Sequence, residues 1–416
     1  MSLIDLLCDE RAWLDFLAYK KEHHISSWRE KELSEFIEKR EYESVCREIE
    51  SGGFPLPKKA VISKQNSKKK RIVYTYPSSE NLVLKLLTHL ILRKYDHLFY
   101  SGLYSFRPGR GAKDAVRRFA RDRRIEKMYS YKVDISDYFN SVDIPLLLPM
   151  LDAAMADDPE LLSFCKRLLC EKCVLEKGEP IEERKGIMAG TPLSSFYANL
   201  FLCELDRYFY ENRIPYARYS DDVIVFAETR EKCNEYAEFI KAFLDKMHLS
   251  VNPEKEFFAK AGEEWTFLGF VFSGGVVDIA PASVKKLKMK MRRKARALAR
   301  WAKRKGLPGE KAAIAFIRAF NRKLFDNPTD TDLTWARWFF PVINTSESLR
   351  IIDNYAQDCI RFLMCETRTK ARFNARYEDI KKLGYKSLVH EFYSFDDEAF
   401  AASASAESAP IDASLR

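Results

Sequence analysis

The sequence predicts an α+β fold in which helices back an antiparallel sheet. Residues 128–139, MYSYKVDISDYF, and residues 223–226, VIVF, have the length and apolar composition of buried strands. Residues 230–246 follow the second stretch and carry apolar side chains at helical spacing, which predicts an amphipathic helix. Short strands are expected at residues 249–252 and 265–272. This order of strands and helices is typical of the α+β class.

The N-terminal region is predicted to contain charged helices followed by a basic hairpin. Residues 1–53 have helical periodicity and end at a Gly-Gly stop signal. Residues 55–77, PLPKKAVISKQNSKKKRIVYTYP, predict a β-hairpin whose turn is Gln-Asn-Ser at residues 65–67.

Several helices are expected around the predicted sheet. Residues 78–99 have a strong apolar stripe and predict a buried helix with Ser78 or Ser79 as its N-cap. Residues 112–124 predict a helix with a basic face. Further helices are expected at residues 144–155, 160–170 and 194–212.

The composition changes after residue 282. Residues 283–306, SVKKLKMKMRRKARALARWAKRKG, contain about a dozen basic residues and no acidic one. This pattern predicts a helix with one core face and a positive surface elsewhere. Two or three more helices are expected up to about residue 394, and the small, polar and acidic tail after it is expected to be disordered. The predicted core face consists of Val284, Leu287, Met291, Leu298 and Ala302.

Length and charge limit the classes of function. A chain of 416 residues with 46% hydrophobic content is long enough for two or three domains. Its 70 Lys and Arg residues exceed its 61 Asp and Glu residues, and the net charge of +9 suits a polyanionic partner. No apolar stretch approaches the roughly 20 residues that span a bilayer. The start, MSLIDLLCDERAW, has acids where a signal peptide has basic residues, so a soluble, cytoplasmic protein without a membrane partner is expected.

Nine cysteines are scattered along the chain without the spacing of a disulfide framework. Cys165, Cys170 and Cys173 have the C-x4-C-x2-C spacing of some iron–sulfur ligand sets. The alternative is that they are reduced core residues on an amphipathic helix that runs into a strand. Cysteine is among the most often buried residue types, and this favours the second interpretation.

The strongest chemical signal is Asp221-Asp222 at the start of an apolar strand. Neighbouring side chains of an extended chain point to opposite faces, so a hairpin tip is needed to bring both near one site. Asp134 closes the other buried strand. Three carboxylates on two adjacent strands predict a site for two Mg²⁺ ions, held by Asp134 and Asp221, with the Ile135 carbonyl, water and substrate phosphates as the remaining ligands. The alternative is that Asp134 and Asp137 cap a helix and that Asp221-Asp222 is an ordinary turn.

Six short motifs in order make the chain resemble a reverse transcriptase. The resemblance covers about residues 54–275, and one motif alone would be weak evidence. The motifs are the Tyr-x-Asp-Asp box at residues 219–222, Asp134 with Phe139, GTPLSSFYAN at residues 190–199, FRPGR at residues 106–110, LSVN with Lys255, and FLGF at residues 267–270.

The resemblance implies a right-hand polymerase with fingers, an antiparallel-sheet palm and a helical thumb. It also implies nucleotidyl transfer with Asp134, Asp221 and Asp222 as catalytic residues and two Mg²⁺ ions, or Mn²⁺, as cofactors. The implied domains are residues 1–53 as an N-terminal helical extension, 54–125 as fingers, 126–280 as palm with finger helices at about 144–185, 281–395 as thumb, and 396–416 as a disordered tail.

The same resemblance implies a deoxynucleotide site. Lys64 and Arg71 flank the hairpin turn and would reach the triphosphate, whereas a solvated basic turn is the alternative. Phe139 would lie beneath the sugar and clash with a 2′-hydroxyl, unless it is a core aromatic. Gly190 would let the nucleotide approach the backbone, and Lys255 would lie near the leaving pyrophosphate, unless it is a surface lysine.

Contacts to nucleic acid are expected after the palm motifs. Phe267, Leu268 and Gly269 would grip the primer strand. The basic helix would lie along a duplex and contact phosphates without reading sequence. Its candidate contacts are Lys288, Arg292, Arg293, Arg296 and Arg300.

Differences between this sequence and the patterns of known reverse transcriptases indicate which subgroup it resembles. No Cys/His nuclease cluster follows the basic helix, which differs from many group II intron enzymes. No RNase H-type acidic set is visible after that helix either. Residues 271–275, VFSGG, replace the Val-Thr-Gly element of retron enzymes. Residues 351–389 resemble compact bacterial reverse transcriptases, several of which are antiphage systems. We therefore expect an RNA-directed DNA polymerase that copies a partner non-coding RNA from dNTPs into cDNA held as an RNA–DNA duplex. The alternatives are template-independent DNA synthesis of the abortive-infection type and a catalytically dead RNA-binding scaffold.

Overall fold

The structure is a computed structural model that describes residues 1–23, 26–63, 70–183, 186–325, 335–367 and 369–395. The predicted turn at residues 65–67, Lys64 and the tail 396–416 lie outside the described residues. The chain forms two compact units, Met1–Ala115 with Lys127–Ala261, and Val116–Glu126 with Gly262–Arg416. Each unit is described by itself.

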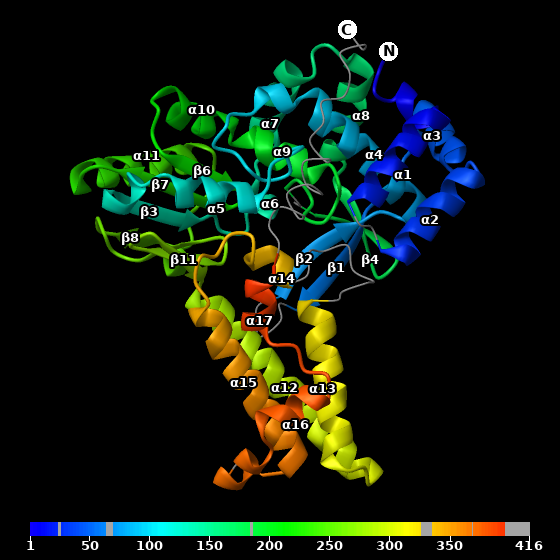
Figure 1. Cartoon of the computed structure of the whole chain (residues 1–416). Helices are drawn as coiled ribbons and strands as arrows, with labels where there is room; N and C mark the ends of the chain where they lie inside the picture. Colours follow the sequence, from blue (N-terminus) through cyan, green and yellow to red (C-terminus); the bar gives the residue numbers. More distant parts are fainter. Residues whose placement is uncertain (24–25, 64–69, 184–185, 326–334, 368, 396–416) are drawn as a thin grey trace. The chain divides into compact units, whose positions relative to one another are not determined.

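A four-stranded antiparallel sheet is the centre of the first unit, and it confirms the predicted α+β class. Its strand order is β6-β7-β3-β8. Helix α11 (Arg230–Lys246) packs on β3 and β7 (Figure 1). Its Ile240 and Leu244 are buried. The strands are β3 (Tyr129–Asp134), β6 (Tyr216–Tyr219), β7 (Asp222–Ala227) and β8 (Phe257–Ala259).

A second sheet contains the predicted basic hairpin. Strands β1 (Lys58–Ser63) and β2 (Lys70–Thr75) pair antiparallel from Lys58↔Thr75 to Ser63↔Lys70. The sheet order is β2-β1-β4-β5, with β1 and β4 parallel. The other two strands are β4 (Cys173–Glu176) and β5 (Glu179–Glu182).

Helices of the first unit surround a continuous apolar core. The core joins the N-terminal helices to the sheet through residues such as Trp13, Leu87 and Phe196, all of them almost fully buried. Removing such side chains from water is the main favourable term in folding. The elements are η1 (Asp5–Cys8), α1 (Glu10–Glu22), α2 (Ser27–Glu38), α3 (Tyr42–Glu50), α4 (Ser78–Lys94), η2 (Asp96–Leu98), α6 (Tyr138–Ser141), α7 (Ile144–Ala154), α8 (Pro159–Cys170), α9 (Ser194–Phe201), α10 (Cys203–Glu211) and η4 (Pro253–Lys255).

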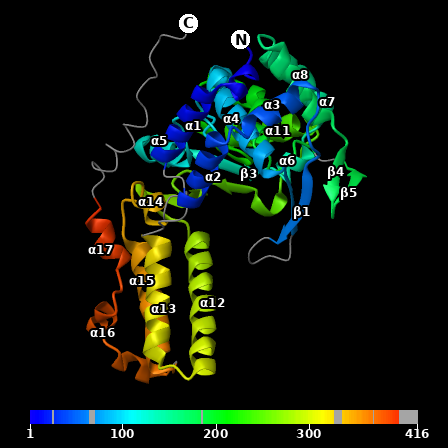
Figure 2. The ribbon, with the colours of Figure 1, turned by 90° about the vertical axis from the view of Figure 1, so that its right-hand side faces the viewer.

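The second unit combines a small sheet with a helical bundle. Strands β9 (Trp265–Phe267), β10 (Phe270–Ser273) and β11 (Val276–Ile279) form an antiparallel meander. Helices α12 (Pro281–Lys305), α13 (Gly309–Leu324) and α15 (Glu347–Cys365) pack against one another (Figure 2). The remaining elements are α14 (Trp335–Phe339), η5 (Lys370–Asn374), α16 (Tyr377–Lys382) and α17 (Leu388–Tyr393), while α5 (Ala112–Arg121) and η3 (Ile125–Lys127) lie where the chain passes between the units.

Asp353 of α15 connects the two ends of the stretch 351–389. Its buried carboxylate accepts hydrogen bonds from the Tyr385 hydroxyl at 2.6 Å, the Ser387 hydroxyl at 2.6 Å and the amides of Leu388 and Val389 at 2.9 and 3.1 Å. A buried carboxylate with this many donors is fully satisfied. The α17 segment is therefore anchored to the bundle.

Several local predictions were wrong, each for a physical reason. Neither Ser78 nor Ser79 caps α4; Pro77 is the N-cap residue, and the Ser78 hydroxyl donates to Glu32. The helix expected over residues 194–212 breaks at Leu202. The strand expected at residues 249–252 is reduced to one isolated bridge, Ile135↔Val251, and β8 pairs with β3 instead.

Differences also occur after residue 261. The second unit includes β9, β10 and β11, which form a sheet separate from that of β3 and β7. The implied boundary between palm and thumb at residues 280–281 stays a prediction. More helical segments follow α12 than expected, and Leu298 is only half-buried while Ala295 is buried. Among the described residues, no helix has both the length and the apolar character needed to cross a membrane.

Candidate active site

The Tyr-x-Asp-Asp box forms the tip of the β6–β7 hairpin. Tyr219 pairs with Asp222, so Ser220 and Asp221 are the two central residues of the turn. Ser220 has a φ of 58°, a left-handed conformation that favours glycine. Such a non-glycine conformation costs on the order of 1–3 kcal/mol and persists only where the surroundings hold it. The turn is therefore a locally strained element.

The pairing of β3 with β7 brings the carboxylates of both motifs to one edge of the sheet. Asp134 is the register partner of Asp222. The Ile135 amide donates to the Asp221 carbonyl at 3.0 Å and extends this pairing by one step. Asp134 is 5% exposed, and Asp221 and Asp222 are half-buried. The three carboxylates predicted to act together thus come from two adjacent antiparallel strands.

Burial and mutual repulsion disfavour charge on this edge. Burial raises the pKa of Asp221 to about 6, with further contributions from the Asp134 and Asp222 carboxylates. Burial also raises the pKa of Asp222, although the Lys132 ammonium opposes the shift. Lys132 Nζ lies 3.8 Å from Asp222 Oδ1. Burial is thus the largest cause of the raised pKa of both Asp221 and Asp222.

Lys255 contacts the first carboxylate directly. Its Nζ lies 2.5 Å from Asp134 Oδ2, and its side chain is 50% exposed. The short 3-10 helix η4 places it there, because Asn252 at the N-cap donates its amide to the Asp134 carbonyl at 2.8 Å. Lys255, which is predicted to lie near the leaving pyrophosphate, therefore forms an ion pair with Asp134, which is predicted to bind a metal ion.

The carboxylates at this edge of the sheet are the candidate ligands of a divalent ion. Among the described residues, no group of three or more His, Cys, Asp or Glu side chains is arranged to hold a metal, so the expected three-carboxylate cluster is not preassembled. Asp134 and Asp221 nevertheless present hard oxygen donors whose negative charges interact, and Mg²⁺ commonly takes one or two carboxylates plus substrate phosphates. The Asp134 and Asp221 carboxylates fit such an ion, while the Ile135 carbonyl stays a predicted ligand.

Phe139 lies on α6, one short turn beyond Asp134. It is half-buried and meets Phe106 edge-on at 6.4 Å and Tyr138 at 5.7 Å between ring centroids. Its carbonyl accepts from the Ile187 amide at 2.9 Å. Gly186 packs so closely here that a Cβ would lie 2.4 Å from the Phe139 carbonyl oxygen. This close packing fixes the backbone of Phe139, while its role beneath a sugar stays a prediction.

The other predicted nucleotide contacts belong to the β1–β2 sheet. Arg71 is exposed on β2, opposite Ile62. The loop before α9 joins the same strand, because the Tyr74 amide donates to the Ala189 carbonyl at 2.8 Å. Gly190 has a φ of 104°, and a Cβ there would lie 3.0 Å from the Tyr74 carbonyl oxygen. Arg71 thus lies on β2, and Gly190 packs against the same strand. This strand belongs to a different sheet from the one that carries the Asp134 and Asp222 carboxylates.

The cysteine spacing does not correspond to a common site in the structure. Cys165 is buried in α8, Cys170 is exposed at its end, and Cys173 is half-buried on β4. Burial raises the pKa of the Cys165 thiol to about 12. Cys165 therefore has the surroundings of a core residue.

The predicted primer grip and basic helix belong to the second unit. Leu268 and Gly269 form the turn between β9 and β10, with φ values of 49° and 89°, and Phe267 is fully buried against Phe119. On α12, Lys288 lies over the Tyr355 ring at 4.9 Å. Arg292, Arg293, Arg296 and Arg300 are exposed on the same helix.

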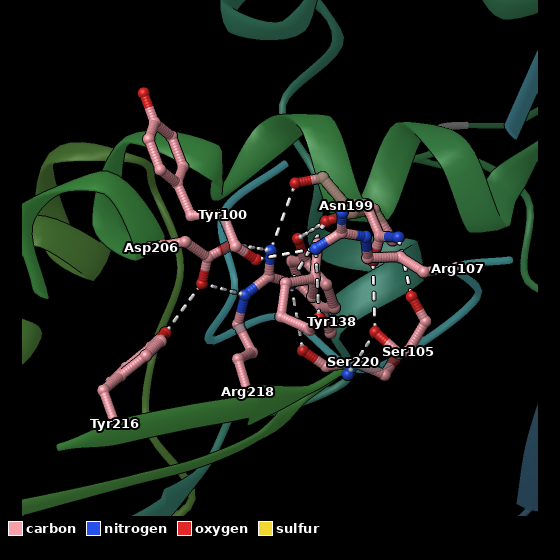
Figure 3. A network of polar contacts seen from close by, with 11 residues as sticks. Tyr100, Ser105, Arg107, Tyr138, Asn199, Asp206, Tyr216, Arg218 and Ser220 are labelled. Carbon is pink, nitrogen blue, oxygen red and sulfur yellow. Dashed lines mark hydrogen bonds and ion pairs between the residues drawn. The ribbon is translucent and has the colours of Figure 1, made fainter. Parts of the chain in front are cut away.

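A buried ion pair next to the Tyr-x-Asp-Asp turn was not predicted from the sequence. Arg218 is fully buried, and its Nε and NH2 donate to the two oxygens of Asp206 at 2.8 and 2.5 Å (Figure 3). The Tyr216 hydroxyl also donates to Asp206, at 2.9 Å. The sequence did contain one indication, because Arg218 is a charged residue in a short strand of otherwise uncharged residues. Nothing in the sequence distinguishes Asp206 from the other acidic residues of helix α10.

Three solved structures similar to the chain are telomerases from Candida. Sequence identity is 12–13%, and the chain spans 55–65% of their length. They are an apo telomerase from Candida tropicalis truncated from its C-terminal domain (54% of this chain, TM-score 0.44), a Candida albicans telomerase in complex with a TWJ fragment of telomeric RNA (86%, 0.45) and an apo Candida tropicalis telomerase (84%, 0.46).

The family comparison covers the segment that contains the carboxylates. Comparison with curated proteins gives no significant match. The family described as "Reverse transcriptase (RNA-dependent DNA polymerase)" matches residues 57–272, just over half of the chain. The antiparallel sheet with its paired carboxylate motifs lies within this match, so the α+β fold is that of a right-hand polymerase. The chain belongs to the reverse transcriptase family, whose members are RNA-directed DNA polymerases.

Proposed function

We propose that this protein copies RNA into DNA by adding deoxynucleotides to a primer 3′ end. The observation that carries the proposal is the register of Asp134 with Asp222, with Asp221 joined to Ile135 by a backbone hydrogen bond of 3.0 Å. Nucleotidyl transfer requires anionic ligands held rigidly at one point. A hairpin tip bonded to the neighbouring strand meets that requirement.

The residues of the chain have separate tasks in this proposal. Asp134, Asp221 and the Ile135 carbonyl hold two Mg²⁺ ions, or Mn²⁺, and Asp222 supports them from its pair with Lys132. When bound, the ions supply the positive charge that activates the primer hydroxyl and neutralises the triphosphate. Lys255 protonates the leaving pyrophosphate, and Lys64 and Arg71 bind the phosphates. Phe139 and Gly190 shape the sugar and base site.

The proposed nucleic-acid partner is an RNA template paired with growing DNA. The net charge of +9 and the exposed arginines of α12 support a phosphate-binding surface. We propose that Phe267, Leu268 and Gly269 contact the primer strand. Contacts of this kind position a duplex without reading its sequence.

We further propose a structured non-coding RNA as template and antiphage defence as the cellular role. The support is the resemblance of residues 351–389 to compact bacterial enzymes of that kind. This part of the proposal is an analogy of architecture and does not follow from the site chemistry.

The test is DNA synthesis by purified protein with Mg²⁺, dNTPs and the RNA that co-purifies with it. Wild type should make DNA complementary to that RNA, Asp221→Ala/Asp222→Ala should make none, and Asp245→Ala, an exposed acid on α11, should match wild type. Product sequence unrelated to the bound RNA would identify template-independent synthesis. Wild-type synthesis no greater than that of the double variant would reject polymerase activity and favour an RNA-binding scaffold.

A further inference from the structure

Ser105 connects two motifs that are far apart in the sequence. It is fully buried in the loop before the FRPGR motif. Its hydroxyl accepts a hydrogen bond from the Ser220 amide at 2.9 Å and donates to Asn199 Oδ1 at 3.1 Å (Figure 3). One oxygen atom therefore lies between the catalytic turn and the last residue of the GTPLSSFYAN motif.

The orientation of the Ser105 hydroxyl is fixed by reciprocal bonding. Asn199 Nδ2 donates to the Ser105 carbonyl at 2.8 Å, so the two residues are joined in both directions. Arg218 holds the same assembly from the other side, since its NH2 donates to the Asn199 carbonyl at 3.1 Å and its NH1 to the Ser220 carbonyl at 3.4 Å. The Asp206 carboxylate in turn holds that guanidinium. Both backbone polar groups of Ser220 thus have partners within one buried network.

Ser220 needs such support because its backbone is in a conformation that suits glycine. Its φ is 58°, and it is 8% exposed, so water has little access to replace a lost partner of its amide. A buried amide without an acceptor is costly, and a strained turn can relax to find another. Asp221 is the next residue after Ser220. If the turn relaxes, the Asp221 carboxylate therefore moves away from Asp134 and Asp222, which are paired with each other across β3 and β7.

We propose that Ser105 is a positioning residue for nucleotidyl transfer, whose hydroxyl holds the Ser220 turn and thereby the Asp221 carboxylate. The proposal rests on the proposed function. Ser105 touches neither substrate nor metal and acts through the backbone of Ser220. Small misplacements at a reacting centre are sufficient for a large effect, since about 1 Å can cost about 100-fold in rate.

The test compares Ser105→Ala with Ser130→Ala. Ser130 is a matched control, because it is 1% exposed on β3 and its hydroxyl has no hydrogen-bond partner among the described residues. In single-turnover primer extension on an RNA template with Mg²⁺, Ser105→Ala should lower the rate constant at saturating dNTP at least about tenfold. The KM for primer–template should stay within about twofold. Displacement of Asp221 affects the transition state of the reaction and so lowers kcat, whereas the contacts that bind primer–template in the ground state do not change. Ser130→Ala should match wild type in both constants.

A second measurement does not depend on activity. Amide hydrogen exchange of the peptide covering residues 219–222 should be faster in Ser105→Ala than in wild type, and unchanged in Ser130→Ala. Equal rate constants in the two variants overturn the proposal even if Ser105→Ala melts at a lower temperature, because Ser105 is then only a structural residue. Equal exchange in the two variants also overturns it. If wild type makes no DNA, the proposed function fails, while the exchange comparison still decides whether Ser105 holds the turn.

Discussion

Lys255 Nζ lies 2.5 Å from Asp134 Oδ2, at the sheet edge where a divalent ion is expected. In the proposed reaction, the lysine and the ion would compete for one carboxylate until a nucleotide supplies further negative charge. This relationship connects metal affinity to the leaving-group chemistry of the proposed reaction.

Replacing Lys255 by Met should have opposite effects on metal binding and on turnover. Without nucleotide, Mn²⁺ should bind about twofold to fivefold more tightly, because a half-exposed ion pair contributes about 1 kcal/mol or less. Single-turnover incorporation should slow about 100-fold, the lower range for loss of a general acid. Calorimetric Mn²⁺ titration and rapid-quench extension measure the two effects. The exposed Lys246→Met is the control, and a Lys255→Met enzyme that keeps the wild-type rate would remove Lys255 from the chemistry.

Asp221 should make the metal-free protein less stable as the pH rises. Its pKa in the folded state is about 6, against an ordinary value of 3.8, so the folded protein binds more protons than the unfolded chain between about pH 4 and 6. The free energy of unfolding contributed by this group therefore decreases as the pH rises through that window. At neutral pH, Asp221→Asn should unfold with a free energy on the order of 1–3 kcal/mol larger than wild type.

The measurement for this prediction is urea denaturation with chelator at several pH values. Mg²⁺ should raise the melting temperature of wild type and leave that of Asp221→Asn nearly unchanged, because a ligand stabilises only the state that binds it. Asp245→Asn, an exposed acid of α11, serves as the control. Equal pH dependence in Asp221→Asn and wild type would contradict the prediction.

The Arg218–Asp206 pair should show strong non-additivity. Asp206→Ala leaves a fully buried guanidinium without its carboxylate and should lower the free energy of unfolding by about 3–5 kcal/mol. The double variant Arg218→Met/Asp206→Leu removes both charges, so it should be more stable than Asp206→Ala alone. Urea denaturation measures the three free energies. Lys232→Ala, which breaks an exposed pair with Glu235, should change stability by less than about 1 kcal/mol. A double variant no more stable than Asp206→Ala would contradict the argument.

The parts of the site that sequence could predict are those that depend on local patterns. An apolar run next to Asp221-Asp222 predicts a strand with a turn before it, and the structure has β7 beginning at Asp222. Helix α11 begins and ends at the predicted residues because its apolar periodicity is uninterrupted and Thr229 caps it. Periodicity and capping are local properties, and they need no knowledge of the fold.

The missed features depend on contacts between distant segments. Ser105 and Ser220 are 115 residues apart, and nothing in the sequence around Ser105 marks its hydroxyl as a partner of the turn. Strand β8 was not predicted, because Phe257 and Phe258 are exposed and do not give the pattern of a buried strand. Its extended conformation depends on its pairing with β3, which is distant in the sequence. Sheet pairing and buried polar networks are properties of tertiary structure, so residue patterns alone do not predict them.

The exposed arginines of α12 should set the salt dependence of nucleic-acid binding. Arg292→Ala/Arg296→Ala removes two charges one helical turn apart. Affinity for an RNA–DNA duplex should fall equally for all sequences, and the slope of log K against log salt should become less steep by about 1 for each phosphate that is no longer bound. Fluorescence anisotropy over a salt series measures both. Lys381→Ala/Lys382→Ala removes the same charge from α16 and should leave the slope unchanged; equal effects of the two double variants would indicate only a change in net charge.

Phe139 should set the preference for deoxynucleotides. Its ring is held edge-on by Phe106 and its backbone by Ile187, so the ring has little room to move aside for a 2′-hydroxyl. Phe139→Val removes most of this bulk and should raise ribonucleotide incorporation relative to deoxynucleotide incorporation by about 10- to 100-fold, the range for one methylene group or one added hydroxyl in a pocket. The ratio of kcat/KM for rNTP and dNTP on one template measures the effect. Phe258→Val removes an exposed ring of β8 and should keep the wild-type ratio. A Phe139→Val enzyme that is folded, active and unchanged in this ratio would show that Phe139 is a core aromatic and that another residue excludes the 2′-hydroxyl.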